Sequence, residues 1–343
     1  MFKKKELIDD SFIIAEVGQN HQGDLDIALE YIEKFASTGL DAVKFQTRNN
    51  KYLFSESAYE KKYNSENAFA EKYGEHREKL ELDPAVLPTL KQKCKEHGLK
   101  FMSTPFDEPS LEILCENDID ILKVASFDLG NLPLIEKIAK TGIPTVISIG
   151  GGKIDQIRSS IELLTEYLDE VAVLHCVSEY PTDVNRLGLS NIRMLIDEFP
   201  SCTIGLSDHF SGILSGPIAY TEGARVFEKH VTMNHAWKGT DHSFALEFDG
   251  MRKFVRDIKR VPMMFNSKPE DEIGDEQVFQ KLGKSLIISR DIKKGETLNA
   301  DNLSGRIFES QYIPVRESNR VIGKTVKKDM KKDDILEYDS VDL

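Results

Sequence analysis

The sequence lacks the features that mark several classes of protein. Its cysteines are Cys94, Cys115, Cys176 and Cys202, and no two have the CxxC spacing, which favours reduced thiols in a cytoplasm over a disulfide framework. No stretch approaches the roughly 20 apolar residues that span a bilayer. The charged N-terminal stretch, MFKKKELIDD, lacks the apolar run of a signal peptide. We therefore expect a cytoplasmic protein with no membrane anchor.

Basic residues are outnumbered by acidic ones, with 45 lysines and arginines against 58 aspartates and glutamates. The 343 residues carry a formal net charge of −13 at pH 7, so we expect neither nucleic acid nor an acidic membrane as a partner. Any anionic ligand therefore needs a local cluster of cations. A hydrophobic content of 40% and a charged content of 30% are ordinary for a soluble globular protein. The length suggests roughly two domains.

Short β-branched runs alternate with amphipathic helical stretches through most of the chain. The strand candidates are residues 12–18, 41–47, 99–106, 121–126, 144–150, 170–177, 202–209 and 224–232. Eight strand–helix units predict a (β/α)8 TIM barrel, because parallel strands need crossover helices and eight strands close a sheet. An open doubly wound sheet is the structural alternative, but no GxGxxG follows the first strand, which argues against it.

Apolar residues at helical spacing mark the connecting helices. The stripes are Leu25, Ala28, Leu29, Ile32 and Phe35; Ile154, Ile157, Ile161 and Leu164; and Met251, Phe254, Val255 and Ile258. Between two predicted strands, residues 48–83 form a polar, tyrosine-rich excursion that is too long for a simple loop. Such excursions at the top of a barrel usually shape the substrate site.

The pattern changes after about residue 262. We predict a barrel domain over residues 1–262, a polar linker over 263–283, and a small β-rich domain over 284–343. Within this tail RDIKKGETL (290–298) returns as KDMKKDDIL (328–336), which suggests two similar halves.

The stretch TIGLSDHF (203–210) begins as a buried strand and ends with Ser207, Asp208 and His209. For one strand alone, the simplest interpretation is a strand that runs into a polar, Asp-capped helix. However, every predicted strand ends in polar groups, and the carboxyl ends of barrel strands meet on the catalytic face. The strand-end residues are Glu16, Lys44, Gln46, Ser103, Thr104, Lys123, Ser126, Ser148, His175, Ser207, His209 and His230.

Two kinds of group stand out in this ring. Lys44 and Lys123 lie on apolar strands, where an uncompensated ammonium is unfavourable, so we interpret them as anion-binding residues. Hydroxyl donors suited to a phosphate accompany them, namely Thr104, Ser126, Ser148 and Ser207.

The second kind of group is a pair of histidines, His209 and His230, at the ends of neighbouring strands. A lone strand-end histidine is more often only a hydrogen-bonded polar residue. Two neutral imidazoles are good ligands for a first-row divalent metal, with Glu16 available directly or through water. These residues predict a metal-assisted reaction on a small phosphorylated metabolite, and they leave aldol reactions, isomerisations and hydrolyses open.

At these positions the sequence resembles the sialic acid synthase family, which condenses phosphoenolpyruvate with an aminosugar aldehyde. The matching strings are FIIAEVGQNHQG (12–23), DAVKFQT (41–47), FMSTPFD (101–107), LKVAS (122–126), IGLSDH (204–209), EKHVT (228–232) and GTDHSFAL (239–246). The tail resembles the antifreeze-like (SAF) domain of these enzymes, through SLIISRDIKKGETLNADNL (285–303).

The resemblance implies an N-acetylneuraminate synthase-like transferase. Such an enzyme joins phosphoenolpyruvate to an N-acylmannosamine-type sugar to give a nonulosonic (sialic-type) acid and phosphate. His209 and His230 match the family's ligands for a divalent metal, with Mn²⁺ expected first and Mg²⁺ or Co²⁺ as alternatives. Catalytic roles carry over to Glu16, Lys44, Lys123 and Tyr180. Substrate-binding roles carry over to Gln46, Thr104, Ser126, Ser148, Ser178, Ser207, Asp241 and Arg306.

The sequence also departs from the family pattern. The usual STGM is SIGG at 148–151, Ser178 replaces an asparagine, and GRIFE (305–309) replaces KRPG, so that Arg306 lies one place early. That arginine reads the sugar's N-acyl group in the family, so the acceptor stays open here. The resemblance further implies a domain-swapped homodimer in which each tail covers the partner's barrel.

Two alternatives remain. The first is a synthase of shorter sugars that uses phosphoenolpyruvate, of the ketodeoxyoctulosonate-phosphate type, against which the SAF-like tail argues. The second is a sugar sensor without catalysis on the same scaffold. The presence of both lysines, both histidines and Glu16 argues against a sensor, which needs neither a base nor a metal.

Overall fold

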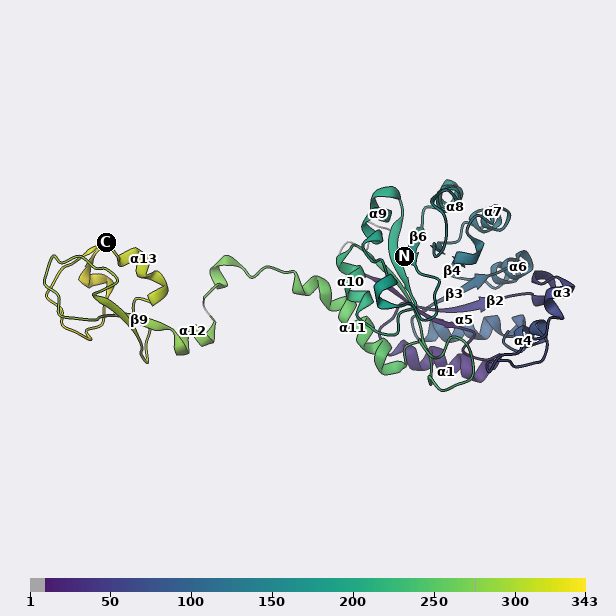
Figure 1. Cartoon of the computed structure of the whole chain (residues 1–343), viewed down its shortest axis with the longest axis horizontal. Coiled ribbons are helices and arrows are strands. Elements are labelled where there is room, and N and C mark those ends of the chain that lie inside the picture. The colour runs from purple at the N-terminus through teal and green to yellow at the C-terminus, as the bar shows by residue number, and fades with distance from the viewer. Residues whose placement is uncertain (1–9, 275) are drawn as a thin grey trace. The chain divides into compact units, whose positions relative to one another are not determined.

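The computed structural model describes residues 10–274 and 276–343 and divides the chain into two compact units (Figure 1). The first unit ends at Phe265 and the second begins at Asn266. The predicted absence of a signal peptide rests mainly on residues 1–9, which lie outside the described residues. Among the residues that are described, no helix is both long and apolar enough to cross a membrane.

In the described part of the first unit, eight parallel strands close into a barrel. The strands are β1 (Phe12–Gly18), β2 (Ala42–Thr47), β3 (Lys100–Pro105), β4 (Ile121–Val124), β5 (Thr145–Ser148), β6 (Val171–Cys176), β7 (Thr203–Asp208) and β8 (Val226–His230). The barrel closes because β1 pairs in parallel with β8, in a register that sets Glu16 opposite His230. The predicted (β/α)8 barrel is confirmed, and the open-sheet alternative is wrong.

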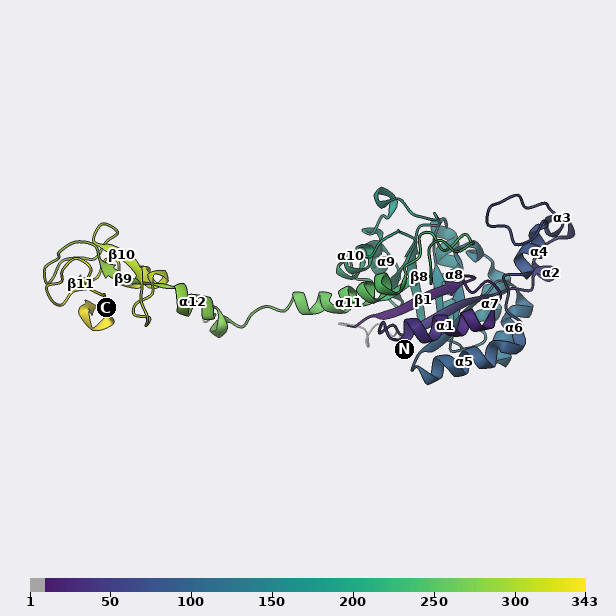
Figure 2. The ribbon, with the colours of Figure 1, turned by 90° about the horizontal axis from the view of Figure 1, so that it is seen from below.

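Helices surround the strands, as Figures 1 and 2 show. They are α1 (Leu25–Ala36), α5 (Leu87–Glu96), α6 (Glu108–Glu116), α7 (Leu132–Ala139), α8 (Ile154–Tyr167), α9 (Asn191–Glu198), α10 (Ser215–Thr221) and α11 (Phe248–Met264). The predicted apolar stripes face the core in α1, α8 and α11. Ile154 is an exception: it is 45% exposed because it begins α8, before the helix has turned onto the barrel.

The residues that point into the barrel form an apolar floor. It consists of Phe12, Ile14, Ala42, Met102, Ile121, Val146, Ala172, Leu174 and Val226. Because strand side chains alternate between the two faces, the next inward positions toward the carboxyl ends include Glu16, Lys44 and Lys123. The strands therefore hold a polar layer directly above an apolar one.

The predicted excursion over residues 48–83 is folded. It contains α2 (Asn50–Leu53), α3 (Glu56–Tyr59) and α4 (Tyr73–Glu78), which Figure 2 shows grouped together, and η1 (Pro84–Val86) follows it. The side chain of Asn67 accepts a hydrogen bond from the backbone N–H of Gly239 (3.0 Å), which ties the excursion to the loop after β8. Two further short helices, η2 (Ser126–Asp128) and η3 (Val184–Arg186), follow β4 and β6.

The second unit has its own apolar core, which includes Leu286, Ile288 and Leu336. Its elements are η4 (Glu270–Glu272), α12 (Gln277–Leu282), β9 (Lys284–Ile288), β10 (Leu303–Ile307), η5 (Val315–Glu317), α13 (Ser318–Val321), β11 (Thr325–Val326), η6 (Tyr338–Ser340) and β12 (Val341–Asp342). The two predicted repeats meet at Ile292 and Met330, whose backbones exchange hydrogen bonds of 2.9 and 3.0 Å.

A buried ion pair joins β7 to β8 on the outer face of the barrel. Lys229 Nζ lies 2.6 Å from Asp208 Oδ2, and both side chains are fully buried. Ser215 Oγ also donates to this carboxylate. The polar end of TIGLSDHF is thus divided, because Asp208 faces the helices while Ser207 and His209 line the cavity.

Replacing one member of this pair leaves the other as a buried, unpaired charge. We expect Lys229→Met to lower the free energy of unfolding by about 3–5 kcal/mol, measured by urea denaturation. The matched control is Lys253→Met, which removes a solvent-exposed pair with Asp249 on α11 and should change stability by less than about 1 kcal/mol. Equal effects of the two substitutions would contradict this account of the pair.

Candidate active site

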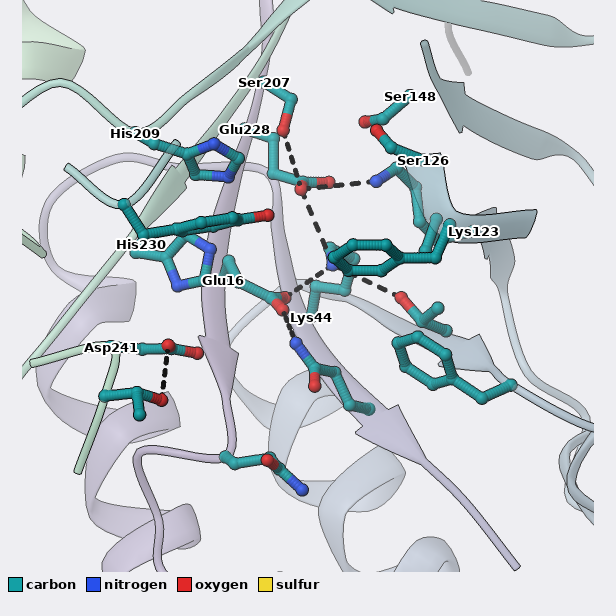
Figure 3. Close-up of a pocket in the computed structure, with 18 of the residues that line it drawn as sticks. Glu16, Lys44, Lys123, Ser126, Ser148, Ser207, His209, Glu228, His230 and Asp241 are labelled. Carbon is teal, nitrogen blue, oxygen red and sulfur yellow. Dashed lines mark hydrogen bonds and ion pairs between the residues drawn. The ribbon is translucent and has the colours of Figure 1, made fainter. Parts of the chain in front are cut away.

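A cavity of about 510 Å³ opens at the carboxyl ends of the barrel strands (Figure 3). Most of the predicted site residues line it: Glu16, Lys44, Gln46, Thr104, Lys123, Ser126, Ser148, Tyr180, Ser207, His209, His230 and Asp241. Arg306 belongs to the second unit, where its side chain is 57% exposed and pairs with Asp333 (2.7 Å).

A chain of alternating charges crosses the floor of the cavity. Lys44 Nζ lies 2.7 Å from Glu16 Oε2 and 3.6 Å from Glu228 Oε1. Lys123 Nζ lies 3.4 Å from the same oxygen of Glu228, to which Ser207 Oγ also donates (3.2 Å). Glu228 therefore connects the two lysines, as the dashed lines in Figure 3 show.

Burial and ion pairing shift the pKa values of these groups in different directions. Burial opposes ionisation of Glu228, but Lys123 and Lys44 overcome it and lower the pKa of its carboxyl. Despite burial, Glu16 and Glu228 raise the pKa of Lys44. Burial, only partly offset by Glu228, lowers the pKa of Lys123. Burial also raises the pKa of Glu16 against the influence of Lys44. Glu16 is thus a better proton acceptor than an exposed glutamate.

Two of the predicted hydroxyl donors have no partner within the described residues. Among the described residues, Ser148 Oγ and Ser178 Oγ are buried and form no hydrogen bond. Ser148 lines the cavity and is free to donate to a ligand there, whereas Ser178 is not among the lining residues. Ser126 Oγ accepts from the backbone N–H of Gly150 (3.0 Å). A Cβ at Gly150 would lie 2.3 Å from Ser178 Oγ, so the glycine in the local sequence SIGG leaves room for the Ser178 hydroxyl.

The two predicted metal ligands lie side by side at the ends of the adjacent strands β7 and β8. The ring centroids of His209 and His230 are 5.4 Å apart, and Tyr180 packs on His209 at 4.1 Å. His209 Nδ1 contacts the carbonyl of Val177 (2.8 Å), which can only accept, so the lone pair of His209 lies on Nε2. Burial lowers the pKa of His230 to about 4, and its Nδ1 has no partner among the described residues.

Two neutral imidazoles fit a divalent first-row metal. Within residues 10–274 and 276–343, no group of three histidine, cysteine, aspartate or glutamate side chains is arranged to bind a metal. The protein thus offers a pair of nitrogen ligands there, and further ligands have to come from solvent or substrate.

The rim of the cavity carries arginines that the sequence did not single out. Gln46 Nε2 donates to Glu16 (2.7 Å), and Gln46 Oε1 accepts from Arg48 Nη2 (2.6 Å). Arg77, from α4, also lines the cavity. Asp241 accepts a hydrogen bond from Thr240 (2.8 Å) on the loop after β8. The cavity therefore has a buried floor, formed by the lysines and the carboxylates that pair with them, and a rim that carries the two arginines.

Two strand-end residues from the predicted ring do not reach the cavity. His175 lies outside the barrel, with Nε2 2.7 Å from the carbonyl of Leu187, and Ser103 Oγ contacts Thr47 Oγ1 (2.9 Å). Both occupy outward positions of their strands, so the prediction from strand ends alone was wrong for them. Glu228 was missed although it lies two residues before His230, a spacing that puts both on the inward face.

The chain matches known proteins over most of its length. The NeuB family matches residues 31–269, and the SAF domain matches residues 283–342. N-acetylneuraminate-9-phosphate synthase of Homo sapiens is 34% identical, over 96% of this chain and 92% of that protein. N,N'-diacetyllegionaminic acid synthase of Campylobacter jejuni is 32% identical, over 95% of this chain and 98% of that one.

A solved structure agrees. The crystal structure of N-acetylneuraminic acid (sialic acid) synthetase from Leptospira borgpetersenii in complex with citrate aligns with a TM-score of 0.68 at 30% identity. The alignment covers 77% of this chain and 89% of that one.

The shared carboxylate of Glu228 gives a stability prediction. Glu228→Gln leaves Lys123 without a carboxylate partner, so we expect the free energy of unfolding to fall by about 3 kcal/mol. Ser207→Ala removes one hydrogen bond to the same oxygen and should lower it by only about 1 kcal/mol. Urea denaturation measures both, and a Glu228→Gln protein as stable as the wild type would contradict the role of this carboxylate.

Proposed function

Since this chain belongs to the NeuB family and carries a SAF domain, we propose that it condenses phosphoenolpyruvate with an N-acylmannosamine-type sugar aldehyde. The products are a nonulosonic acid and inorganic phosphate. The observation that carries the proposal is the pairing of Lys44 and Lys123 through Glu228 on the inward face of the barrel, beside the hydroxyls of Ser126, Ser148 and Ser207.

In this proposal, the floor of the cavity binds phosphoenolpyruvate. Lys44 and Lys123 supply two positive charges for its phosphate and carboxylate, and these groups compete with Glu228 for the ammonium protons. Ser148 donates the hydrogen bond that its side chain does not make within the protein. Thr104 and Ser126 also line the cavity. Charge-assisted bonds in a desolvated cavity are strong enough to fix the orientation of the enol.

The acceptor lies above phosphoenolpyruvate. We propose that His209 and His230 hold a divalent metal, with Mn²⁺ expected first on the family resemblance and Mg²⁺ or Co²⁺ as alternatives. When bound, the metal supplies the Lewis acidity that polarises the aldehyde carbonyl. Tyr180 packs beside His209 and, with Gln46 and Asp241, lines the space for the sugar hydroxyls.

Carbon 3 of phosphoenolpyruvate bonds to the aldehyde carbon and leaves positive charge at carbon 2. The π electrons of the carbonyl move to the aldehyde oxygen, which takes up a proton and becomes a hydroxyl. Water adds at carbon 2, and the tetrahedral intermediate expels phosphate. Glu16 is proposed to accept the proton of this water, because burial raises the pKa of its carboxyl. Gln46 holds Glu16 by a hydrogen bond of 2.7 Å, which orients the carboxylate.

We further propose a cytoplasmic homodimer in which the second unit acts on the partner's barrel. The exposed apolar run at the end of α11 supports an interface, since Met263, Met264 and Phe265 are 68–75% exposed. The exposed side chain of Arg306 is then available to reach the partner's sugar site. Each tail in this arrangement also shields the intermediate from water.

Release of phosphate tests the function. The chain, supplied with a divalent metal and phosphoenolpyruvate, should release inorganic phosphate only when an N-acylmannosamine, or its 6-phosphate, is added. Lys44→Ala and Lys123→Ala should each lower kcat/KM for phosphoenolpyruvate by about 10- to 100-fold, because each removes a charge-assisted bond. The control is Lys100→Ala, an exposed lysine at the opposite end of β3. A lysine variant with normal kcat and KM refutes its assignment.

Metal removal tests the role of the histidines. EDTA should abolish activity and added Mn²⁺ should restore it, because the aldehyde needs a Lewis acid. His209→Ala and His230→Ala should weaken Mn²⁺ binding, measured by calorimetry. Both variants should keep the circular dichroism spectrum of the folded protein. His97→Ala, on the surface at the end of α5, is the control. Full activity of the metal-stripped enzyme would rule the metal out.

Subunit mixing tests the exchange of tails. Lys123→Ala impairs the barrel, and Arg306→Ala is expected to impair the tail. Hybrid dimers formed from the two variants contain one site without either lesion if the tails act on the partner, so part of the activity should return. If hybrids form but the mixture stays as inactive as its components, the tail acts on its own barrel or Arg306 is not a site residue.

A further inference from the structure

A chain of hydrogen bonds leads from the rim of the cavity to the proposed proton acceptor. At its inner end, Gln46 Nε2 donates to Glu16 Oε1 (2.7 Å). Farther out, Arg48 Nη2 donates to Gln46 Oε1 (2.6 Å), and Arg48 Nη1 donates to Glu81 Oε1 (3.2 Å). The amide of Gln46 thus joins a guanidinium on the rim to a carboxylate that lines the cavity.

The guanidinium determines which way round the amide of Gln46 lies. A guanidinium only donates hydrogen bonds, so the atom of Gln46 that faces Arg48 must be the carbonyl oxygen. The NH2 group then faces Glu16, which accepts hydrogen bonds in its ionised form. An amide turned by half a rotation would set its oxygen against the carboxylate and its NH2 group against the guanidinium, and both bonds would be lost. Arg48 therefore fixes the donor that holds Glu16.

Arg48 is itself held by several neighbours. Its guanidinium carbon lies 3.8 Å from the centroid of the Phe106 ring. Its backbone N–H donates to Glu81 Oε2 (3.2 Å) while Nη1 donates to Oε1, so one carboxylate binds both the main chain and the side chain of Arg48. Gln19 Nε2 also donates to Glu81 Oε1 (2.8 Å). The side chains of Arg48 and Glu81 are only 9% and 12% exposed, so packing restricts both.

Glu81 balances the positive charges of the rim. Burial, opposed by Glu81 and reinforced by the positive charge of Arg77, lowers the pKa of Arg48 to about 10, so its guanidinium stays charged near neutral pH. Burial raises the pKa of Glu81, and the charges of Arg48 and Arg77 act in the opposite direction. Glu81 is thus the counter-charge of both arginines, which leaves Nη2 of Arg48 for the amide of Gln46.

Both oxygens of the Glu16 carboxylate are bound. Lys44 Nζ lies 2.7 Å from Oε2, and the amide of Gln46 donates to Oε1. Gly18, at the end of β1, has a φ of +56°, and a Cβ there would lie 3.1 Å from both Gln46 Nε2 and Glu16 Oε1. The glycine therefore lets the main chain pass close to this hydrogen bond. The orientation of the carboxylate depends on the amide at one oxygen and on the ammonium at the other.

We propose that Arg48 is a positioning residue, which acts through Gln46 to hold the carboxylate of Glu16 where it accepts the proton of the attacking water. The inference rests on the proposed function and adds a residue to its mechanism. Arg48 acts on the reaction only through the amide of Gln46. Loss of the guanidinium frees this amide to turn, and a displaced carboxylate slows the addition of water without weakening the binding of phosphoenolpyruvate.

A double-mutant cycle tests this role. Phosphate release is measured with the full chain, Mn²⁺, phosphoenolpyruvate and N-acetylmannosamine or its 6-phosphate, whichever supports turnover. We expect Gln46→Met to lower kcat by about 100-fold and Arg48→Met to lower it by about 10-fold. The KM for phosphoenolpyruvate should change by less than about 2-fold in Arg48→Met. Added to Gln46→Met, the Arg48→Met change should have no further effect on kcat, because the amide through which it acts is gone.

A second variant, Arg48→Lys, separates positioning from folding because it keeps a positive charge beside Glu81. One ammonium does not reproduce the planar fork that reaches Glu81 and Gln46 together, so kcat should still fall, and only where Gln46 is present. Circular dichroism checks that each variant is folded. The control is Arg158→Met, which removes an exposed pair with Glu198 and should leave kcat unchanged with or without Gln46→Met.

The outcomes separate this inference from the proposed function. If Arg48→Met lowers kcat equally with and without Gln46→Met, Arg48 acts on the fold or on a substrate directly, and the positioning role is overturned. A higher KM for either substrate with an unchanged kcat overturns it as well. Both results leave the synthase function standing. No phosphate release by the wild-type chain overturns the proposed function and this inference together.

Discussion

The carboxylate of Glu228 lies between the ammonium groups of Lys44 and Lys123, above an apolar floor in which a single unpaired charge would be strongly unfavourable. Because this one carboxylate pairs with both ammonium groups, the barrel can hold two buried cations before an anionic substrate binds. Lys44 also pairs with Glu16, so the charge of Lys44 is shared between two carboxylates. An incoming phosphate takes over part of the role of Glu228, so binding exchanges one set of charge pairs for another.

Much of the fold was predictable because it rests on local patterns. Eight β-branched runs alternating with helical stripes leave few arrangements other than a closed parallel barrel, and the repeat in the tail predicted its two halves. The departures have local causes. Ile154 satisfies the helical spacing of its stripe but begins α8, where a side chain has no turn before it and faces solvent.

The candidate site was predictable only in part, because the sequence analysis did not distinguish the residues of each strand that point into the barrel from those that point outward. Residues at the ends of strands were expected to converge, but only every second one points inward, which placed His175 and Ser103 outside the cavity. The same alternation would have identified Glu228 from its spacing to His230. Arg77 was beyond reach, because its position depends on how a long irregular excursion packs on a loop more than 150 residues away along the chain.

The cavity divides the work between regular and irregular parts of the chain. The lysines, Glu16 and the histidines come from strands or strand ends, which fix them to the rigid barrel. The rim draws Arg77 from α4 and Asp241 from the loop after β8. Two relatives of this chain are named for different products, N-acetylneuraminate 9-phosphate and N,N'-diacetyllegionaminic acid.

The opposite orientations of neighbouring residues in β7 and β8 have a consequence for how these strands tolerate substitution. Inward Ser207, Glu228 and His230 line the cavity, whereas outward Asp208 and Lys229 hold the barrel to its helices. A saturation library across the two strands should therefore contain almost no neutral position, yet the reasons for failure alternate. Substitutions at outward positions should lower the cellular abundance of the protein, whereas those at inward positions should lower its activity. Because the two kinds of position alternate along a strand, separate measurements of abundance and activity would show which residues point inward.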